Sequence, residues 1–82
     1  MKGNEMISQK QCHALKFCRT EWRHDYDRAS GVGAPFIREL ADLGLVEFGT
    51  PPGWEGKCYI ATDAGRAAIR EYEDAFGPVL KD

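Results

Sequence analysis

A short helix that ends at a glycine and passes directly into a strand constrains this fold more than any other feature. Pro35 suits the first turn of a helix, where its missing N–H leaves no hydrogen bond unmade. Gly44 stands where a left-handed residue ends a helix, and residues 45–48 continue as a β-prone run. The buried stripe of the helix would consist of Phe36, Ile37, Leu40 and Leu43. We therefore predict a helix over residues 35–43 that is followed at once by a strand.

The pattern after Gly44 predicts a β-hairpin. Residues 45–48 and 57–61 are rich in β-branched or aromatic side chains, and they are close enough in the chain to pair as antiparallel strands. The link between them contains three glycines and two prolines, which exclude a regular element and favour a protruding loop. We predict a hairpin over residues 45–61.

The hairpin is followed by a predicted C-terminal helix. Thr62 is suited to the N-cap position, and Gly77-Pro78 would end the helix, so its expected range is residues 62–76. The apolar residues that repeat at helical spacing in this range are Ala68, Ile69, Tyr72 and Phe76.

A first helix is predicted at the start of the chain. Ser8 and Gln11 have the spacing of a capping box, which indicates a helix over residues 7–19. Its buried stripe would consist of Cys12, Leu15, Cys18 and Trp22. Residues 20–30 are rich in charge and poor in apolar side chains, and they fit either a short helix or an irregular loop.

Length and composition fit one small α+β domain over residues 1–82. The chain has 43% hydrophobic residues, and its three cysteines are an odd number without a C-x-x-C pair, so we expect free, buried thiols in a reducing compartment. No run approaches the ~20 apolar residues of a membrane span, and residues 1–6 lack the apolar core of a signal peptide. We expect a cytoplasmic protein that does not bind a membrane.

Two segments carry a more specific pattern, residues 35–47 (PFIRELADLGLVE) and residues 59–66 (YIATDAGR). The first resembles the recognition helix of the winged helix-turn-helix family as it enters the wing, particularly in MarR-like and small phage or bacterial regulators. The second is similar to the segment that opens the helix after the wing. The resemblance covers residues 30–70 and implies a winged helix with a helical N-terminal half, a β-hairpin wing and a C-terminal helix. It also implies a DNA-binding transcriptional regulator, which would contact more base pairs as a homodimer.

The distribution of charge indicates where double-stranded DNA would bind. Residues 1–38 carry a net charge of +3, whereas residues 39–82 carry −5. Neutralising phosphates requires a local excess of Lys and Arg, so the N-terminal half would face DNA. Lys10 and His24 belong to this half, and the residues that we predict to bind nucleic acid are Lys16, Arg19, Arg23, Arg28, Arg38 and, in the hairpin, Lys57.

A second hypothesis rests on side chains that do not suit DNA. At the exposed positions of the recognition-type helix, Glu39 and Asp42 would bring negative charge toward the phosphates. Trp54, in the loop of the hairpin, either packs on its own hairpin or anchors an interface with a partner. Trp54, Glu39 and Asp42 are therefore candidate protein-interface residues. In this alternative the chain is a winged-helix protein-interaction module, such as a phage-encoded inhibitor (anti-CRISPR-like or anti-defence) of a nucleic-acid-handling host complex.

Nothing in the sequence indicates an enzyme. His13 and His24 have no carboxylate or thiolate at metal-ligand spacing, so no metal site is expected. Asp25 and Asp27 lack an accompanying nucleophile and base, and Gly31-x-Gly33 lacks the lysine of a phosphate loop. We predict no catalytic residue and no cofactor.

Overall fold

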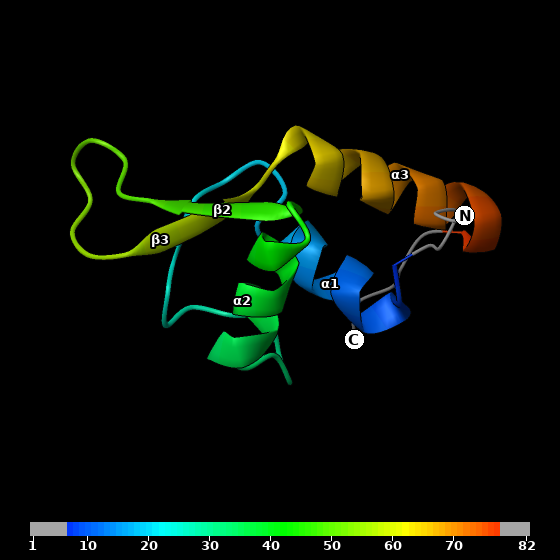
Figure 1. Cartoon of the computed structure of the whole chain (residues 1–82), viewed down its shortest axis with the longest axis horizontal. Coiled ribbons are helices and arrows are strands. Elements are labelled where there is room, and N and C mark those ends of the chain that lie inside the picture. The colour runs from blue at the N-terminus through cyan, green and yellow to red at the C-terminus, as the bar shows by residue number, and fades with distance from the viewer. Residues whose placement is uncertain (1–6, 78–82) are drawn as a thin grey trace.

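The computed structural model describes residues 7–77, which form three α-helices and a small three-stranded antiparallel sheet (Figure 1). Helix α1 (Gln9–Phe17) lies within the predicted range of 7–19. Its capping box is confirmed, because the Ser8 hydroxyl accepts from the Gln11 N–H (3.1 Å) while the Gln11 side chain accepts from the Ser8 N–H (2.8 Å). Residues 1–6, which we expected not to form a signal peptide, and Pro78 lie outside the described range.

The sheet contains one strand that the sequence did not predict. Strands β2 (Val46–Gly49) and β3 (Cys58–Ala61) form the expected hairpin, and β1 (Arg23–His24) pairs with the other side of β3. The strand order is therefore β1-β3-β2, with His24 opposite Cys58 and Cys58 opposite Gly49. Between Phe17 and Ala34 the chain forms no helix, which decides the alternatives left open for residues 20–30.

Helix α2 (Ala34–Asp42) begins with Pro35 in its first turn and is followed by Gly44 in a left-handed conformation (φ +80°). Leu43 and Gly44 form the turn between α2 and β2. Helix α3 (Asp63–Phe76) starts at Thr62, whose hydroxyl accepts from the Gly65 N–H (3.0 Å). The left-handed Gly44 and the Thr62 N-cap each depend on residues that are close together in the chain, so the sequence alone predicts both.

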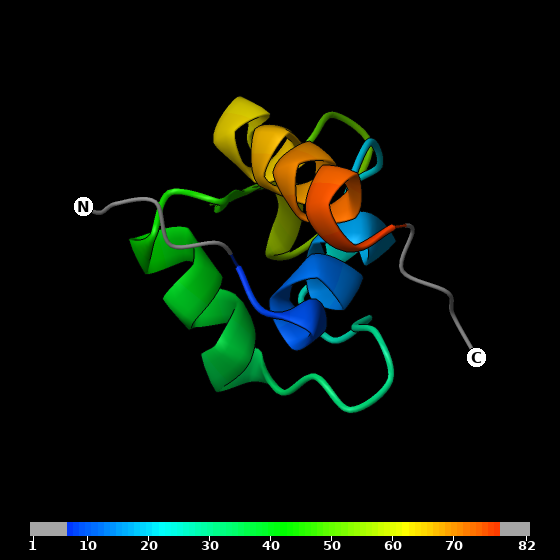
Figure 2. The same ribbon diagram turned by 90° about the vertical axis from the view of Figure 1, so that its right-hand side faces the viewer.

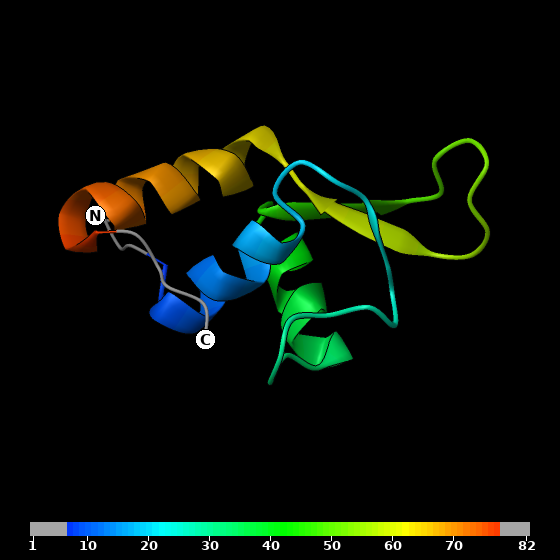
Figure 3. The same cartoon turned by 180° about the vertical axis from the view of Figure 1, so that it is seen from behind.

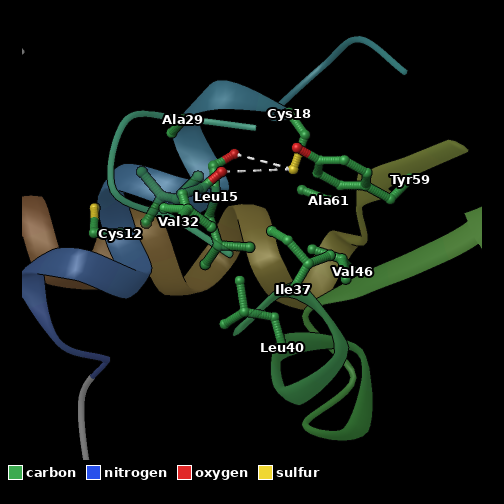
Figure 4. Close-up of a cluster of buried hydrophobic side chains, with 12 residues drawn as sticks. Cys12, Leu15, Cys18, Ala29, Val32, Ile37, Leu40, Val46, Tyr59 and Ala61 are labelled. Carbon is green, nitrogen blue, oxygen red and sulfur yellow. Dashed lines mark hydrogen bonds between the residues drawn. The ribbon is translucent and has the colours of Figure 1, made fainter. Parts of the chain in front are cut away.

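The core lies where α1 packs against α3, α2 and the sheet (Figures 2 and 3). The three cysteines are free and buried, as predicted. Burial raises the pKa of the Cys18 thiol to about 11, and this thiol faces the carbonyl oxygens of Ala14 and Leu15 (Figure 4). The buried Tyr59 donates its hydroxyl proton to the Asp27 carbonyl (2.7 Å), which ties the segment after β1 to the core. No helix within residues 7–77 is long and apolar enough to cross a membrane.

Three apolar residues that were assigned to buried stripes lie elsewhere. Helix α1 ends at Phe17, so helical spacing does not extend to Trp22, which is only partly buried and lies just before β1. Leu43 follows the last residue of α2 and is 61% exposed. Phe76 in the last turn of α3 is 68% exposed and packs on the Tyr72 ring, at 4.8 Å between centroids, instead of entering the core.

Candidate interaction surface

Lys16, one of the predicted phosphate-binding residues, lies in the contact between two helices. Its Nζ is 2.6 Å from Glu73 Oε2 of α3, and the two side chains are 29% and 24% exposed. A partly buried ion pair of this kind holds the ammonium in place and offsets its charge. Lys16 therefore joins α1 to α3.

Arg23 and Arg28 also bind groups of their own chain. The Arg23 Nε donates to the Phe17 carbonyl (2.7 Å), and its guanidinium lies 4.2 Å from the centroid of the Phe17 ring. Arg28 donates from Nε to the Val32 carbonyl (3.1 Å) and from a terminal nitrogen to the Asp25 carbonyl. These bonds to carbonyls hold the irregular segment between α1 and α2 in one conformation.

The other predicted nucleic-acid residues come from three different parts of the fold. Arg19 is exposed just after α1, and Arg38 is exposed on α2 together with Glu39 and Asp42. Lys57 precedes β3, and its Nζ lies 4.4 Å from the Phe48 ring centroid. No hydrogen bond or ion pair joins Arg19, Arg38 and Lys57 within residues 7–77.

Trp54 lies against a ring from a distant part of the sequence. Its ring centroid is 4.8 Å from that of His24 in β1, and the His24 ring stacks on Tyr26 at 5.0 Å with an interplanar angle of 8°. Trp54 is 39% exposed and Tyr26 is 77% exposed. Exposed aromatic rings retain a large apolar area that only a partner can bury.

Trp22 extends this group of rings across the sheet. A Cβ atom added at Gly49 would lie 3.1 Å from the Trp22 ring, so the ring crosses from the β1 side over β3 to β2. Cys58 shares this sheet face with His24 and Gly49 by register, and it is fully buried. We use the name aromatic surface for Trp22, His24, Tyr26 and Trp54.

Two open clefts flank Trp22. The first, of about 350 Å³, reaches from Trp22 to Trp54, and its lining includes Glu21, Arg23 and Asp27. The second, of about 540 Å³, runs from Trp22 toward the start of α3, and its lining includes Glu47, Ile60, Asp63 and Arg66. Because Trp22 lines both, it forms the ridge between them.

The residues of the YIATDAGR segment have structural roles. The Thr62 hydroxyl donates to the Gly44 carbonyl (2.6 Å), and the Thr62 N–H donates to the Leu45 carbonyl (3.0 Å). A Cβ atom at Gly65 would overlap the Leu45 carbonyl oxygen, so only glycine allows this approach of α3. Arg66 donates to the carbonyls of Ala61 (3.0 Å) and Arg19 (3.2 Å) and pairs with Asp63. We call residues 44–45 and 61–66 the junction.

Sequence reasoning found Trp54 but missed the three rings beside it. Trp22, His24 and Tyr26 alternate with charged residues, and this period of two is typical of a strand. The run is too short to be distinctive, and the sequence alone suggests only a cation or a metal ligand at His24. Within residues 7–77, no group of three or more His, Cys, Asp and Glu side chains is placed to hold a metal ion.

Comparisons of the chain with protein-family models, with curated proteins and with solved structures found no match.

Proposed function

We propose that this chain is a protein-interaction module that binds a partner protein through the aromatic surface. The observation that carries the proposal is the pair of exposed rings, Tyr26 and Trp54, that contact His24 from two sides beside the two clefts lined by Trp22. Trp and Tyr dominate the binding energy of many protein interfaces because they bury a large area with few rotatable bonds. Rings stacked on one another are also held in place before the partner arrives, which lowers the entropic cost of binding.

The scaffold is proposed to be a variant of the winged helix. The hairpin would be the wing, α2 would hold the position of the recognition helix, and β1 would occupy the third position in the sheet. The segment between Phe17 and Ala34 then replaces the first helix of the helix-turn-helix motif. In this arrangement the segment serves to present Trp22, His24 and Tyr26.

DNA binding is the second candidate, and the exposure of Arg38 on α2 favours it. An arginine at this position could contact a guanine edge or a phosphate. The engagement of Lys16, Arg23 and Arg28 with groups of their own chain leaves fewer cations for the backbone of DNA. These observations support the protein-interaction module over a regulator of transcription.

The proposal is tested by selecting peptides from a displayed random library on the immobilised whole chain. We expect the selected peptides to bind Trp54→Ala and Trp22→Ala at least about tenfold more weakly than the wild type, as for hot-spot residues. Phe76→Ala is the matched control, because Phe76 is another exposed aromatic residue but lies at the end of α3. Peptides that bind all four proteins equally, or a failure to select any peptide, would overturn the proposal.

The second candidate is tested by titrating labelled duplex DNA at two salt concentrations with the wild type, Trp54→Ala and Arg38→Ala. A regulator should bind at low salt, lose affinity steeply as salt rises, and depend on Arg38. If the wild type does not bind the duplex at low salt, DNA binding is excluded as the function. Tight DNA binding that Arg38→Ala weakens and Trp54→Ala leaves unchanged would instead favour the regulator.

A further inference from the structure

We infer that the partner segment is a basic, extended peptide whose Lys or Arg side chains enter the clefts on both sides of Trp22. This inference rests on the proposed function and adds the chemistry of the partner. It is carried by the placement of charges around the clefts and by aromatic rings that no cation of residues 7–77 covers.

Each cleft has carboxylates at its edge. Glu21 and Asp27 line the first cleft, with side chains 72% and 49% exposed. Glu47 and Asp63 line the second, and the Asp63 side chain is 99% exposed. Glu47 makes no ion pair with residues 7–77. A cationic group that enters either cleft therefore meets a carboxylate that water still reaches.

Each of the two arginines in the clefts binds a backbone carbonyl of this chain and also pairs with a carboxylate of its own cleft. Arg23 binds the Phe17 carbonyl and its ring, and it lies 3.6 Å from Glu21 and 4.0 Å from Asp27. Arg66 binds the carbonyls of Ala61 and Arg19 and pairs with Asp63, whose side chain still remains exposed, whereas Glu47 has no such pair within residues 7–77. Four carboxylates and two arginines give the lining a net charge of −2, which attracts a basic segment and repels the phosphates of a nucleic acid.

The rings of the aromatic surface are open to a cation. Three stacked cation–ring pairs occur within residues 7–77, and each uses a phenylalanine: Lys10 on Phe36, Arg23 on Phe17 and Lys57 on Phe48. Trp22, Tyr26 and Trp54 have no such pair in the described part of the chain. Tryptophan is the best of the aromatic side chains for binding a cation, and guanidinium groups stack on it readily.

Both clefts are lined by Trp22, so one extended chain that passes over this side chain could fill both. In an extended peptide, side chains two residues apart lie on the same side. Basic residues at alternate positions could therefore enter the first cleft and the second while the chain crosses the Trp22 ridge. A compact helix would present its side chains at a different period.

The inference is tested with two labelled peptides of equal length, one alternating Arg with Ala and one alternating Glu with Ala. Fluorescence anisotropy of the whole chain with each peptide should detect binding of the arginine peptide alone. We expect added salt to weaken it, as for exposed charges. The double variant Glu21→Gln/Glu47→Gln should lose about fivefold or more in affinity, roughly 1 kcal/mol at 1.4 kcal/mol per tenfold. Glu71→Gln, an exposed carboxylate of α3 outside both clefts, is the control.

Several outcomes would overturn the inference. Equal binding of the arginine peptide to wild type, the double variant and Trp22→Ala would indicate adsorption to an acidic protein. Tighter binding of a labelled single-stranded oligothymidine than of the arginine peptide would identify the surface as a stacking platform for nucleic acid. If the displayed library yields neutral or acidic peptides that require Trp22 and Trp54, this inference fails while the proposed function stands. If neither experiment detects binding at the aromatic surface, both fail.

Discussion

The junction and the aromatic surface meet at the second cleft, which Trp22 lines together with Thr62, Asp63 and Arg66, yet they use their side chains in opposite ways. In the junction, Thr62 and Arg66 bind carbonyls of other segments, and Gly65 allows backbone contact with Leu45. In the aromatic surface, Tyr26 stacks on His24 and Trp54 contacts the same ring at a tilt, and the two remain 77% and 39% exposed. In the junction, Thr62 and Arg66 have hydrogen-bond partners within the chain. In the aromatic surface, Tyr26 and Trp54 keep apolar area exposed to water.

The most distinctive sequence motif of this chain lies outside the group of exposed rings that we propose to bind a partner. The YIATDAGR segment carries a family resemblance, and its polar residues hold the hairpin to α3. The aromatic surface carries no motif, yet it presents the large exposed rings that favour binding. The residues that carry the family resemblance are therefore not the exposed rings on which the proposed function rests.

The largest effect is expected from a change in the junction, Gly65→Ala. The added methyl group would overlap the Leu45 carbonyl, so α3 or β2 must shift. We expect a loss of about 3 kcal/mol or more in the free energy of unfolding, at the upper end for overpacking. Urea unfolding followed by circular dichroism measures it, with Ala67→Gly on the exposed side of α3 as a control for helix propensity. A Gly65→Ala protein as stable as the wild type would break the description of the junction.

A smaller effect is expected where the core supports the aromatic surface. Tyr59→Phe removes the hydroxyl that donates to the Asp27 carbonyl (2.7 Å). The loss of a part-buried hydrogen bond should cost about 1–2 kcal/mol of stability. Hydrogen exchange should also become faster at the amides of residues 25–28, because the segment after β1 then loses its side-chain bond to Tyr59 of β3. Unchanged exchange there would mean that the stack of rings positions the segment without Tyr59.

Thr62→Ala tests the polar bonds of the junction. The substitution removes both the N-cap of α3 and the bond to the Gly44 carbonyl, so we expect a loss of about 1 kcal/mol. Thr62→Ser should recover most of it, because serine retains the hydroxyl. The midpoint of urea unfolding for the three proteins provides the measurement. Equal midpoints for the alanine and serine variants would show that the hydroxyl bonds contribute nothing net.

The smallest effect on stability is expected from Trp54→Ala. The ring contacts His24 and leaves 39% of the residue exposed, so its removal opens no core cavity. We expect the free energy of unfolding to fall by less than about 1 kcal/mol, because the substitution removes one aromatic pair and a ring that is only partly buried. Thermal unfolding by circular dichroism checks this. Loss of the cooperative transition would assign Trp54 to the structural residues and end the contrast between the two regions.

Local signals account for the part of the fold that could be predicted. The Ser8 capping box, the left-handed Gly44 and the Thr62 N-cap each depend on hydrogen bonds or dihedral angles within a few residues. Strand β1 could not be predicted, because two residues form a strand only when β3 lies beside them. The sequence also does not define where α1 ends, so the helical spacing wrongly predicts a core position for Trp22. Helix α1 ends at Phe17, before the spacing reaches Trp22.

The candidate site was predictable only in part. Trp54 was identified from its loop, because a large apolar ring between prolines and glycines is unusual on local grounds alone. Its partner His24 lies thirty residues earlier in the chain, so no local pattern could join them. The roles of Lys16 and Arg23 were equally hidden, because a cation in the sequence does not show which carboxylate or carbonyl it will meet.

The sequence by itself determined the order of the helices, the hairpin and the caps, because these depend on interactions between neighbours in the chain. Only the tertiary structure decided which charges remain available and which rings gather on one face. Lys16 meets Glu73 across 57 positions, and Trp22 reaches Gly49 across the sheet. The physical reason is that a charge or a ring acts through what lies within a few ångströms of it, and in this chain those neighbours come from distant segments.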